Sequence, residues 1–294
     1  MRPTGAALAL AGSLLAAITL VEARQNGFDY TEIIVPGAVL ANAQGINANG
    51  DVVGIYRDAA AKVRGFVWQD GVVTPIEYPG ALLTEARGIS PSGEIVGTYR
   101  MPGEPAVNVH GFLLTVDGRF VNVDYPGHTN TIPQRILPDG TILGCRHDHD
   151  LMETMRGVVI LPDGTATETD TFASMHNGAT PNGKTVVGLF MNMMTNRSES
   201  YVIEDGEFKE FVVPGSNLTS AWDVNPRGEI VGVYRDADNR VHGFVRQGDH
   251  YLSVDVPGAA ITRVFGINAG GDVVGNFVDT AGRTRAFIGT RTYN

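Results

Sequence analysis

The sequence predicts an all-β protein, a six-bladed β-propeller of four-stranded antiparallel blades, and three observations support this prediction. Glycine supplies 37 of the 294 residues, well above the typical ~7%, so the chain needs many tight turns. One phrase recurs along the chain, and each copy contains four short apolar stretches bounded by turn residues. The first and last copies are incomplete in complementary ways.

The repeat is clearest where residues 45–54, Gly-Ile-Asn-Ala-Asn-Gly-Asp-Val-Val-Gly, return almost unchanged as residues 266–275. The turn glycines of successive copies are 43, 47, 43, 45 and 43 residues apart: Gly50, Gly93, Gly140, Gly183, Gly228 and Gly271. This period, with four strands per copy, is typical of a propeller blade, whereas a strand-containing leucine-rich solenoid uses about 20 to 30 residues per turn. Six copies therefore fill residues 24–294 as a single domain.

The strands of the first copy are expected at residues 42–47, 51–57, 64–69 and 72–78. An Asn-Gly dipeptide or a relative joins the first two strands, and an Asp-Gly dipeptide joins the last two in four copies. Such dipeptides provide the positive φ angles of two-residue hairpins. The Asp-Gly turns are Asp70-Gly71, Asp117-Gly118, Asp163-Gly164 and Asp205-Gly206.

The two ends of the repeat region predict that the ring closes. The sixth copy stops after its third strand, at residues 286–294, while residues 28–37 match the fourth-strand endings of other copies, such as Tyr78-Pro79-Gly80. The N-terminal strand can therefore complete the last blade and remove exposed strand edges. An open β-solenoid, the alternative, would need no such offset.

The repeated phrases resemble the HAF repeats of bacterial extracellular proteins. The resemblance rests on residues 45–58, on His110-Gly111-Phe112 and its counterpart His242-Gly243-Phe244, and on residues 255–259, and it spans residues 28 to 288. It implies a secreted or envelope-associated bacterial protein with a repeat fold. It assigns no functional residue, because the family has no common activity. The third copy departs from the pattern, since Arg135 replaces its leading glycine.

The first 23 residues are predicted to be a signal peptide. Arg2 precedes an apolar run at residues 5–21, and small residues flank Glu22 before an expected mature start at Arg24. An uncleaved membrane anchor is the alternative, although the run is shorter than the ~20 residues that span a bilayer. We therefore expect a secreted or periplasmic protein of the bacterial envelope. No later segment is apolar enough to span a membrane.

Charge and cysteine content narrow the possible partners. The formal net charge is −10 and no run of Lys or Arg occurs, so nucleic acid is excluded as an expected partner. Cys145 is the only cysteine, so an intrachain disulfide is impossible, and its position within a strand predicts a buried, unreactive thiol. We expect a monomer that binds a small polar or anionic ligand, for which carbohydrate is one class. Nothing in the sequence identifies a cofactor.

We expect the site on the face that carries the second-to-third-strand loops and the blade-to-blade crossovers, because these loops vary among copies. The first candidates are arginines at the ends of second strands, which could attract anions or could be structural ties between blades: Arg57, Arg100, Arg146 and Arg235.

The second candidate is the segment at residues 145–150. His147 and His149 point to one side of an extended strand and could be two metal ligands, with His128 or His176 as a third. A solvated polar loop is the alternative. No metal site is predicted, because a fixed ligand set is missing.

The third candidates are equivalent positions around the axis, where four polar or charged residues and two aromatic ones suggest a pocket for a sugar or another polar ligand. Repeat drift is the alternative. These positions are Gln44, Arg87, Gln134, Asn177, Trp222 and Phe265.

The leading hypothesis is a secreted propeller that binds a polar or anionic ligand, such as a glycan or peptide, on its loop face. One alternative is a propeller hydrolase or lyase, and another is a protein-interaction scaffold. No nucleophile-elbow, zinc-protease, P-loop or Rossmann motif supports a named enzyme class. The acid or base residues of such an enzyme would come from His176, His147, His149, Glu85 and Asp223.

Overall fold

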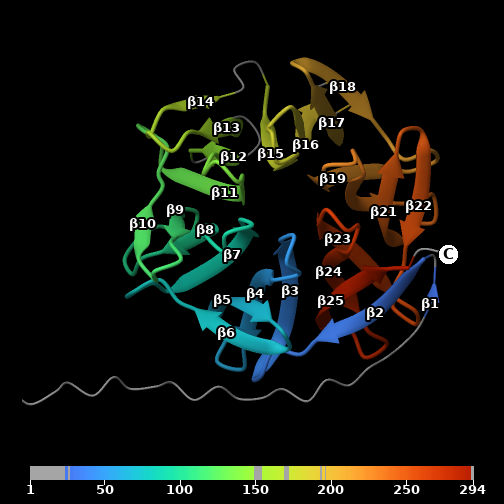
Figure 1. Cartoon of the computed structure of the whole chain (residues 1–294), viewed down its shortest axis with the longest axis horizontal. Helices are drawn as coiled ribbons and strands as arrows, with labels where there is room; N and C mark the ends of the chain where they lie inside the picture. The colour runs from blue at the N-terminus through green and yellow to red at the C-terminus, as the bar shows by residue number, and fades with distance from the viewer. Residues whose placement is uncertain are drawn as a thin grey trace, which may run out of the picture.

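The structure, a computed structural model, describes residues 24–25, 27–148, 154–168, 172–192, 194–195 and 197–292. In these residues, 25 β-strands are arranged around a central axis as a propeller (Figure 1). None of the described residues belongs to a helix of the length and hydropathy needed to cross a bilayer. The predicted signal peptide, residues 1–23, lies outside the described residues.

Each blade is an antiparallel meander whose first strand lies nearest the axis (Figure 1). The first two meanders are β3 (Ala38–Ile46), β4 (Val52–Asp58), β5 (Val63–Gln69) and β6 (Val72–Ile76), then β7 (Leu83–Ile89), β8 (Ile95–Arg100), β9 (His110–Leu114) and β10 (Phe120–Asn122). The next two are β11 (Asn130–Ile136), β12 (Ile142–His147), β13 (Arg156–Ile160) and β14 (Ala166–Glu168), then β15 (Ser174–Ala179), β16 (Thr185–Asn192), β17 (Arg197–Glu204) and β18 (Glu207–Phe211). The remaining strands are β19 (Leu218–Val224), β20 (Ile230–Arg235), β21 (Val241–Gln247) and β22 (His250–Val254), followed by β23 (Ile261–Ile267), β24 (Val273–Val278) and β25 (Thr284–Arg291).

The expectation of six separate blades is wrong in detail, because hydrogen bonding groups the described strands into five sheets. Three sheets have four strands each, one has five, and one has eight. The eight-stranded sheet arises because β5 and β7 meet in a parallel pair at Val63 and Leu83, which joins two consecutive meanders. The described part of the ring is therefore a set of packed sheets and not one continuous sheet.

The two ends of the described chain meet in one sheet. The N-terminal strand β2 (Phe28–Ile33) pairs antiparallel with β25, from Phe28 opposite Arg291 to Ile33 opposite Ala286. The short strand β1 (Arg24–Gln25) pairs with β2 at the outer edge. The predicted pairing of the N-terminal segment with the last repeat is confirmed, and Figure 1 shows β2 beside β25.

The Asp-Gly turns are of two kinds. Asp70 and Gly71 have φ of 49° and 83°, the positive pair that a two-residue hairpin requires, and Asp205 and Gly206 repeat it. At Gly118 and Gly164 only the glycine has positive φ. These two hairpins use longer turns, in which the Gly118 amide donates to the Thr115 carbonyl.

The apolar core lies between neighbouring blades. The third strands of five copies each supply a fully buried aromatic ring. These residues are Phe66, Phe112, Tyr201, Phe244 and Phe287. Cys145 is fully buried in β12, as predicted, and burial raises the pKa of its thiol to about 12. The packed interfaces hold the inner strands at fixed distances around the axis.

Candidate binding site on the propeller axis

Each inner strand contains a β-bulge at the same repeat position. In β19, for example, Ala221 pairs with Gly232 and Asp223 pairs with Val231, so Trp222 is the extra residue. The six bulge residues are those that the sequence singled out as equivalent: Gln44, Arg87, Gln134, Asn177, Trp222 and Phe265. A bulge re-aims its side chain, which is why these residues escape the ordinary strand alternation.

The glycine opposite each bulge is sterically required. A Cβ at Gly97 would lie 1.9 Å from the Glu85 carbonyl oxygen, and a Cβ at Gly275 would lie 1.8 Å from that of Arg263. A side chain at this position would force the first and second strands of the blade apart. The glycine after the two apolar residues of the second strand therefore recurs in all six copies for a steric reason.

Two bulge residues form an aromatic pair. The rings of Trp222 and Phe265 are 4.9 Å apart at their centroids and nearly perpendicular, at 88°. Trp222 is partly exposed, whereas Phe265 is 7% exposed. The indole therefore offers an accessible surface supported by a buried ring.

Other bulge residues brace the axis. Asn177 is fully buried and donates from Nδ2 to the Ala221 carbonyl at 2.8 Å, which ties β15 to β19. Gln134 donates from Nε2 to the Met175 sulfur at 3.2 Å. Gln44 and Gln134 are 6% and 2% exposed. These three side chains are less accessible than the predicted pocket required.

The guanidinium of Arg135 fills the centre of the bulge layer. Its Nη1 donates to the carbonyls of Arg87 at 3.1 Å and Gln134 at 2.8 Å, and its Nη2 donates to those of Gln44 at 3.1 Å and Phe265. The four carbonyls come from β3, β7, β11 and β23, so one buried cation joins four inner strands. Four of the other copies have glycine at this position, and the fifth copy has Asp223.

Asp223 occupies the same repeat position in β19, two inner strands away from Arg135 in β11. Its Oδ2 lies 3.3 Å from Arg135 Nε, and it accepts hydrogen bonds from the amides of Val224 and Ile267. Burial raises the pKa of the carboxyl, while Arg135 and the two amides act in the opposite direction. Both residues line a cavity of about 110 Å³ that opens among the first-to-second-strand turns. Asp223 therefore lies toward the turn face and is held in an ion pair.

Glu85 and Arg87 lie on the loop side of this layer. Arg87 Nη2 is 2.6 Å from Glu85 Oε2, which also accepts a hydrogen bond from the Thr98 hydroxyl at 3.1 Å. Burial acts to raise the pKa of Glu85, but Arg87 and Thr98 outweigh it, so the pKa lies below its usual value. Glu85 is therefore an ionised carboxylate at neutral pH.

Arg263 and Arg235 lie close enough for their positive charges to interact, and we call them the cationic pair. Arg263 is half-buried in β23, two residues before the bulge residue Phe265. Burial and the nearby charge of Arg235 lower the pKa of the Arg263 guanidinium. Its side chain donates to Asn276 Oδ1 at 3.3 Å, and neither arginine forms an ion pair within the described residues. Within the described residues, no carboxylate therefore balances the charge of this pair.

The other arginines at second-strand ends differ in environment. Arg146 is buried and bound to Glu168 in the outer strand of its own blade, with Nη2 2.5 Å from Oε2. This is a structural tie, although within a blade and not between blades. Arg57 is exposed, and Arg100 donates to the Ala106 carbonyl at 2.7 Å. The four arginines therefore do not form one uniform ring.

Two of the candidate histidines, His176 and His147, are buried within the protein. His176 is 5% exposed, its Nδ1 is 2.5 Å from the Tyr201 hydroxyl, and burial lowers its pKa to about 4. His147 is 4% exposed, and its Nδ1 hydrogen-bonds with the Asp148 carbonyl at 2.9 Å. His149 lies outside the described residues. The described residues contain no group of three or more His, Cys, Asp or Glu side chains suited to a metal ion.

Two axial residues escaped the sequence-based selection. Arg135 was visible only as a departure from the leading glycine, and Arg263 precedes a selected aromatic by two residues. Both are charged residues at inner-strand positions where most other copies have uncharged residues. A comparison of the six copies at every inner-strand position would have found them.

Comparisons with known proteins support the fold. No protein-family model and no curated protein sequence matches the chain. Among solved structures, a gluconolactonase from Xanthomonas campestris matches with a TM-score of 0.56 and 14% identity, covering 99% of both chains. The SapL1 lectin, solved with alpha-methyl fucoside, matches with a TM-score of 0.53 and 13% identity over 82% of this chain and 88% of the lectin. The Aleuria aurantia lectin, solved with a fucose-containing disaccharide, matches with a TM-score of 0.50 and 10% identity over 87% of this chain and 93% of the lectin. At these identities the similarity shows that this chain shares the β-propeller fold.

Proposed function

We propose that this protein binds an anionic or polar saccharide on the loop side of its axis, at a site formed by Arg263, Arg235 and the Trp222 indole. A uronic acid fits this chemistry, because its carboxylate can pair with guanidinium groups while its ring stacks on an aromatic face. Solved propellers of similar fold include lectins in complex with fucose-containing ligands, which supports a carbohydrate class.

The observation that carries the proposal is the cationic pair. A half-buried guanidinium beside a like charge and without a carboxylate partner is unfavourable, and an anion would relieve the repulsion. The turn side of the axis offers no comparable site, because Arg135 is already paired with Asp223 and with four carbonyls.

The proposal includes three features expected from the sequence. We count the eight-stranded sheet as two blades, which gives six copies of the bulged inner strand around the axis. We retain the resemblance to HAF-repeat proteins, based on the repeated phrases. We also retain export to the bacterial envelope, based on residues 1–23, and the expected monomeric state.

A hydrolase is the second candidate, supported by Glu85. An ionised carboxylate beside Arg87 could act as a general base on a substrate bound at the axis. One of the solved propellers of similar fold is a gluconolactonase, so lactones of sugar acids belong in the substrate panel. If the protein hydrolyses a lactone and Glu85→Gln abolishes this activity, the hydrolase hypothesis would be favoured over a pure binding function.

The test is a binding titration of the full chain with galacturonate oligosaccharides and with neutral galactose oligosaccharides of equal length. We expect the acidic series to bind at least tenfold more tightly. Arg263→Gln should remove this preference, whereas Arg119→Gln, an exposed arginine paired with Asp117, should leave it unchanged. Equal binding of both series by wild type would disprove the proposed anion site.

A further inference from the structure

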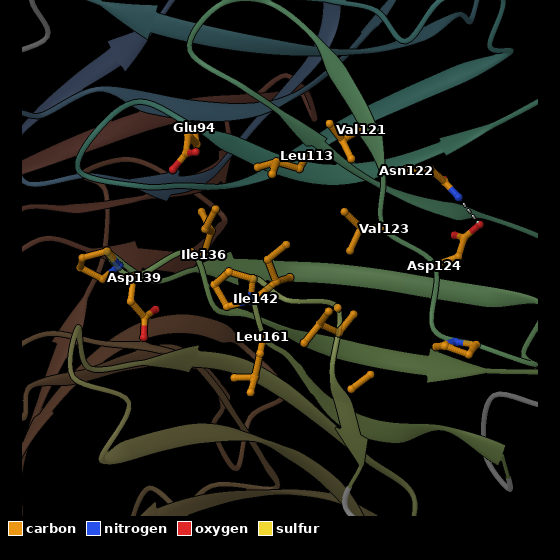
Figure 2. Close-up of a pocket in the computed structure, with 17 residues that line it drawn as sticks. Glu94, Leu113, Val121, Asn122, Val123, Asp124, Ile136, Asp139, Ile142 and Leu161 are labelled. Carbon is orange, nitrogen blue, oxygen red and sulfur yellow. Dashed lines mark hydrogen bonds between the residues drawn. The ribbon is translucent and has the colours of Figure 1, made fainter.

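A second concave surface lies between the β7–β10 and β11–β14 meanders. It has a volume of about 600 Å³. Figure 2 shows Leu113 and Val121 on one wall and Ile142 and Leu161 on the other. Val121 and Leu161 are 43% and 41% exposed, although both are large apolar side chains. We call this surface the β10–β14 groove.

The groove exists because Ala166 is too small to fill it. Strand pairing identifies the equivalent outer-strand residue in each meander, and in four of them this residue is aromatic: Phe120, Phe208, Tyr251 and Tyr30. Tyr30 is 3% exposed and packs against Val245 and Val254 of the preceding blade. Ala166 occupies this position in β14 and lines the groove. The empty space therefore corresponds to a missing aromatic side chain.

The charge at one end of the groove is also uncompensated. Glu94 and Asp139 lie at the same end of the groove but on opposite walls in Figure 2. Glu94 hydrogen-bonds with Ser90 and Ser92, and neither carboxylate has a cationic partner among the described residues. The counterpart Glu229 is bound by Arg227, at 2.5 Å from Nη2. The sequence has Ser92 where that arginine would stand.

We propose that the β10–β14 groove docks a partner polypeptide that presents an aromatic side chain next to a lysine or arginine. The aromatic ring would enter the space left by Ala166 and contact Leu113 and Ile142. The neighbouring cation would pair with Glu94 and Asp139. An apolar anchor in a pocket with a charged rim is the usual form of a small hot spot. This interaction is independent of the saccharide site.

The experiment titrates the full chain with acetyl-Lys-Phe-Lys-amide and follows backbone amide shifts by NMR. We expect shifts in Leu113, Leu161 and Ala166, and at least tenfold weaker binding of acetyl-Lys-Ala-Lys-amide and acetyl-Glu-Phe-Glu-amide. Ala166→Phe should fill the groove from within, weaken binding at least tenfold, and leave the melting temperature equal or higher. Thr167→Phe, the matched control, adds the same ring on the opposite side of β14 and should leave binding unchanged.

Three results would overturn the proposal. The first is unaltered binding by Ala166→Phe, and the second is equal binding of the cationic and anionic peptides. The third is concentration-dependent dimerisation of wild type that Ala166→Phe abolishes, because the occupant would then be a second copy of this chain. If Ala166→Phe lowers the melting temperature, the double variant Glu94→Gln/Asp139→Asn provides the test: it should remove the preference for the cationic peptide, and a retained preference would contradict the proposal.

Discussion

Arg135 and Asp223 form an ion pair at the propeller axis, with Nε 3.3 Å from Oδ2, and both side chains are buried. They come from β11 and β19, two strands separated in the ring by β15 (Figure 1). Glycine occupies the matching position in the other inner strands, where a Cβ at Gly88 would lie 2.7 Å from the Gln134 carbonyl oxygen. The ion pair therefore lies at a level where the neighbouring inner strands leave no room for a Cβ at the glycine of the repeat.

Replacing Arg135 should destabilise the whole ring. Arg135→Ala leaves a buried carboxylate and four carbonyls without their donor, so we expect a loss of about 3–5 kcal/mol in the free energy of unfolding, measured by urea denaturation. Arg135→Ala/Asp223→Asn should recover part of this loss, because the buried charge is gone. Equal stability of the single and double variants would show that the pair is not coupled.

His110 should make stability depend on pH. It lies between Glu104 Oε1, 2.7 Å from Nε2, and Asp124 Oδ2, 2.8 Å from Nδ1. Burial acts to lower its pKa, but the two carboxylates outweigh burial and raise the pKa above the ordinary ~6.5.

A group whose pKa is higher in the folded state than in the unfolded state stabilises the fold when it is protonated. This stabilisation is complete at pH values below the unfolded-state pKa, and it is lost as the pH rises through the folded-state pKa. The melting-temperature difference between wild type and His110→Gln should therefore be larger at pH 5.5 than at pH 8.5. The effect should be about 1 kcal/mol or less, since the side chains are partly exposed. A pH-independent difference would contradict this assignment.

Cys145 should react only when the chain unfolds. Complete burial and a pKa raised to about 12 leave almost no accessible thiolate at neutral pH. Labelling with a thiol reagent should be slow in buffer and should accelerate with the unfolding transition in urea. Rapid labelling of the native protein would place the thiol at the surface.

The N-terminal strand should be essential for the fold. Deleting residues 28–37 removes Phe28, Tyr30 and Ile33, each at most 3% exposed, and exposes the edge of β25. We expect aggregation in size-exclusion chromatography. The milder Tyr30→Ala should cost about 3–5 kcal/mol. A deletion variant that stayed monomeric and melted like wild type would contradict the role of β2 in joining the two ends.

The spacing of the repeats predicted most of the fold, because each copy carries its own turn glycine and the N-terminal segment supplies the fourth-strand ending that the sixth copy lacks. It located the bulge residues, since these stand at one fixed offset from the turns. It could not predict the parallel contact between Val63 and Leu83 that merges two meanders, which depends on the spacing of neighbouring blades.

Side-chain direction limited the prediction of the site. His176 looked like a loop-face catalyst, but it occupies the core-facing position before a bulge and packs against Tyr201. In the sequence, Arg135 only replaces the glycine of the repeat. In the structure, its side chain donates hydrogen bonds to carbonyls of four strands. Such contacts connect residues more than 40 positions apart, so no local pattern reveals them.

The most direct test of the saccharide site uses the two tryptophans of the chain, Trp68 and Trp222. Their indole N–H signals can be recorded by two-dimensional NMR and assigned with Trp68→Phe. During titration with trigalacturonate, we predict that the Trp222 signal shifts with saturation while the Trp68 signal stays in place, and that Arg263→Gln abolishes the shift. Saturable binding that leaves the Trp222 signal unmoved, or moves only the Trp68 signal, would contradict a saccharide site at the loop side of the axis.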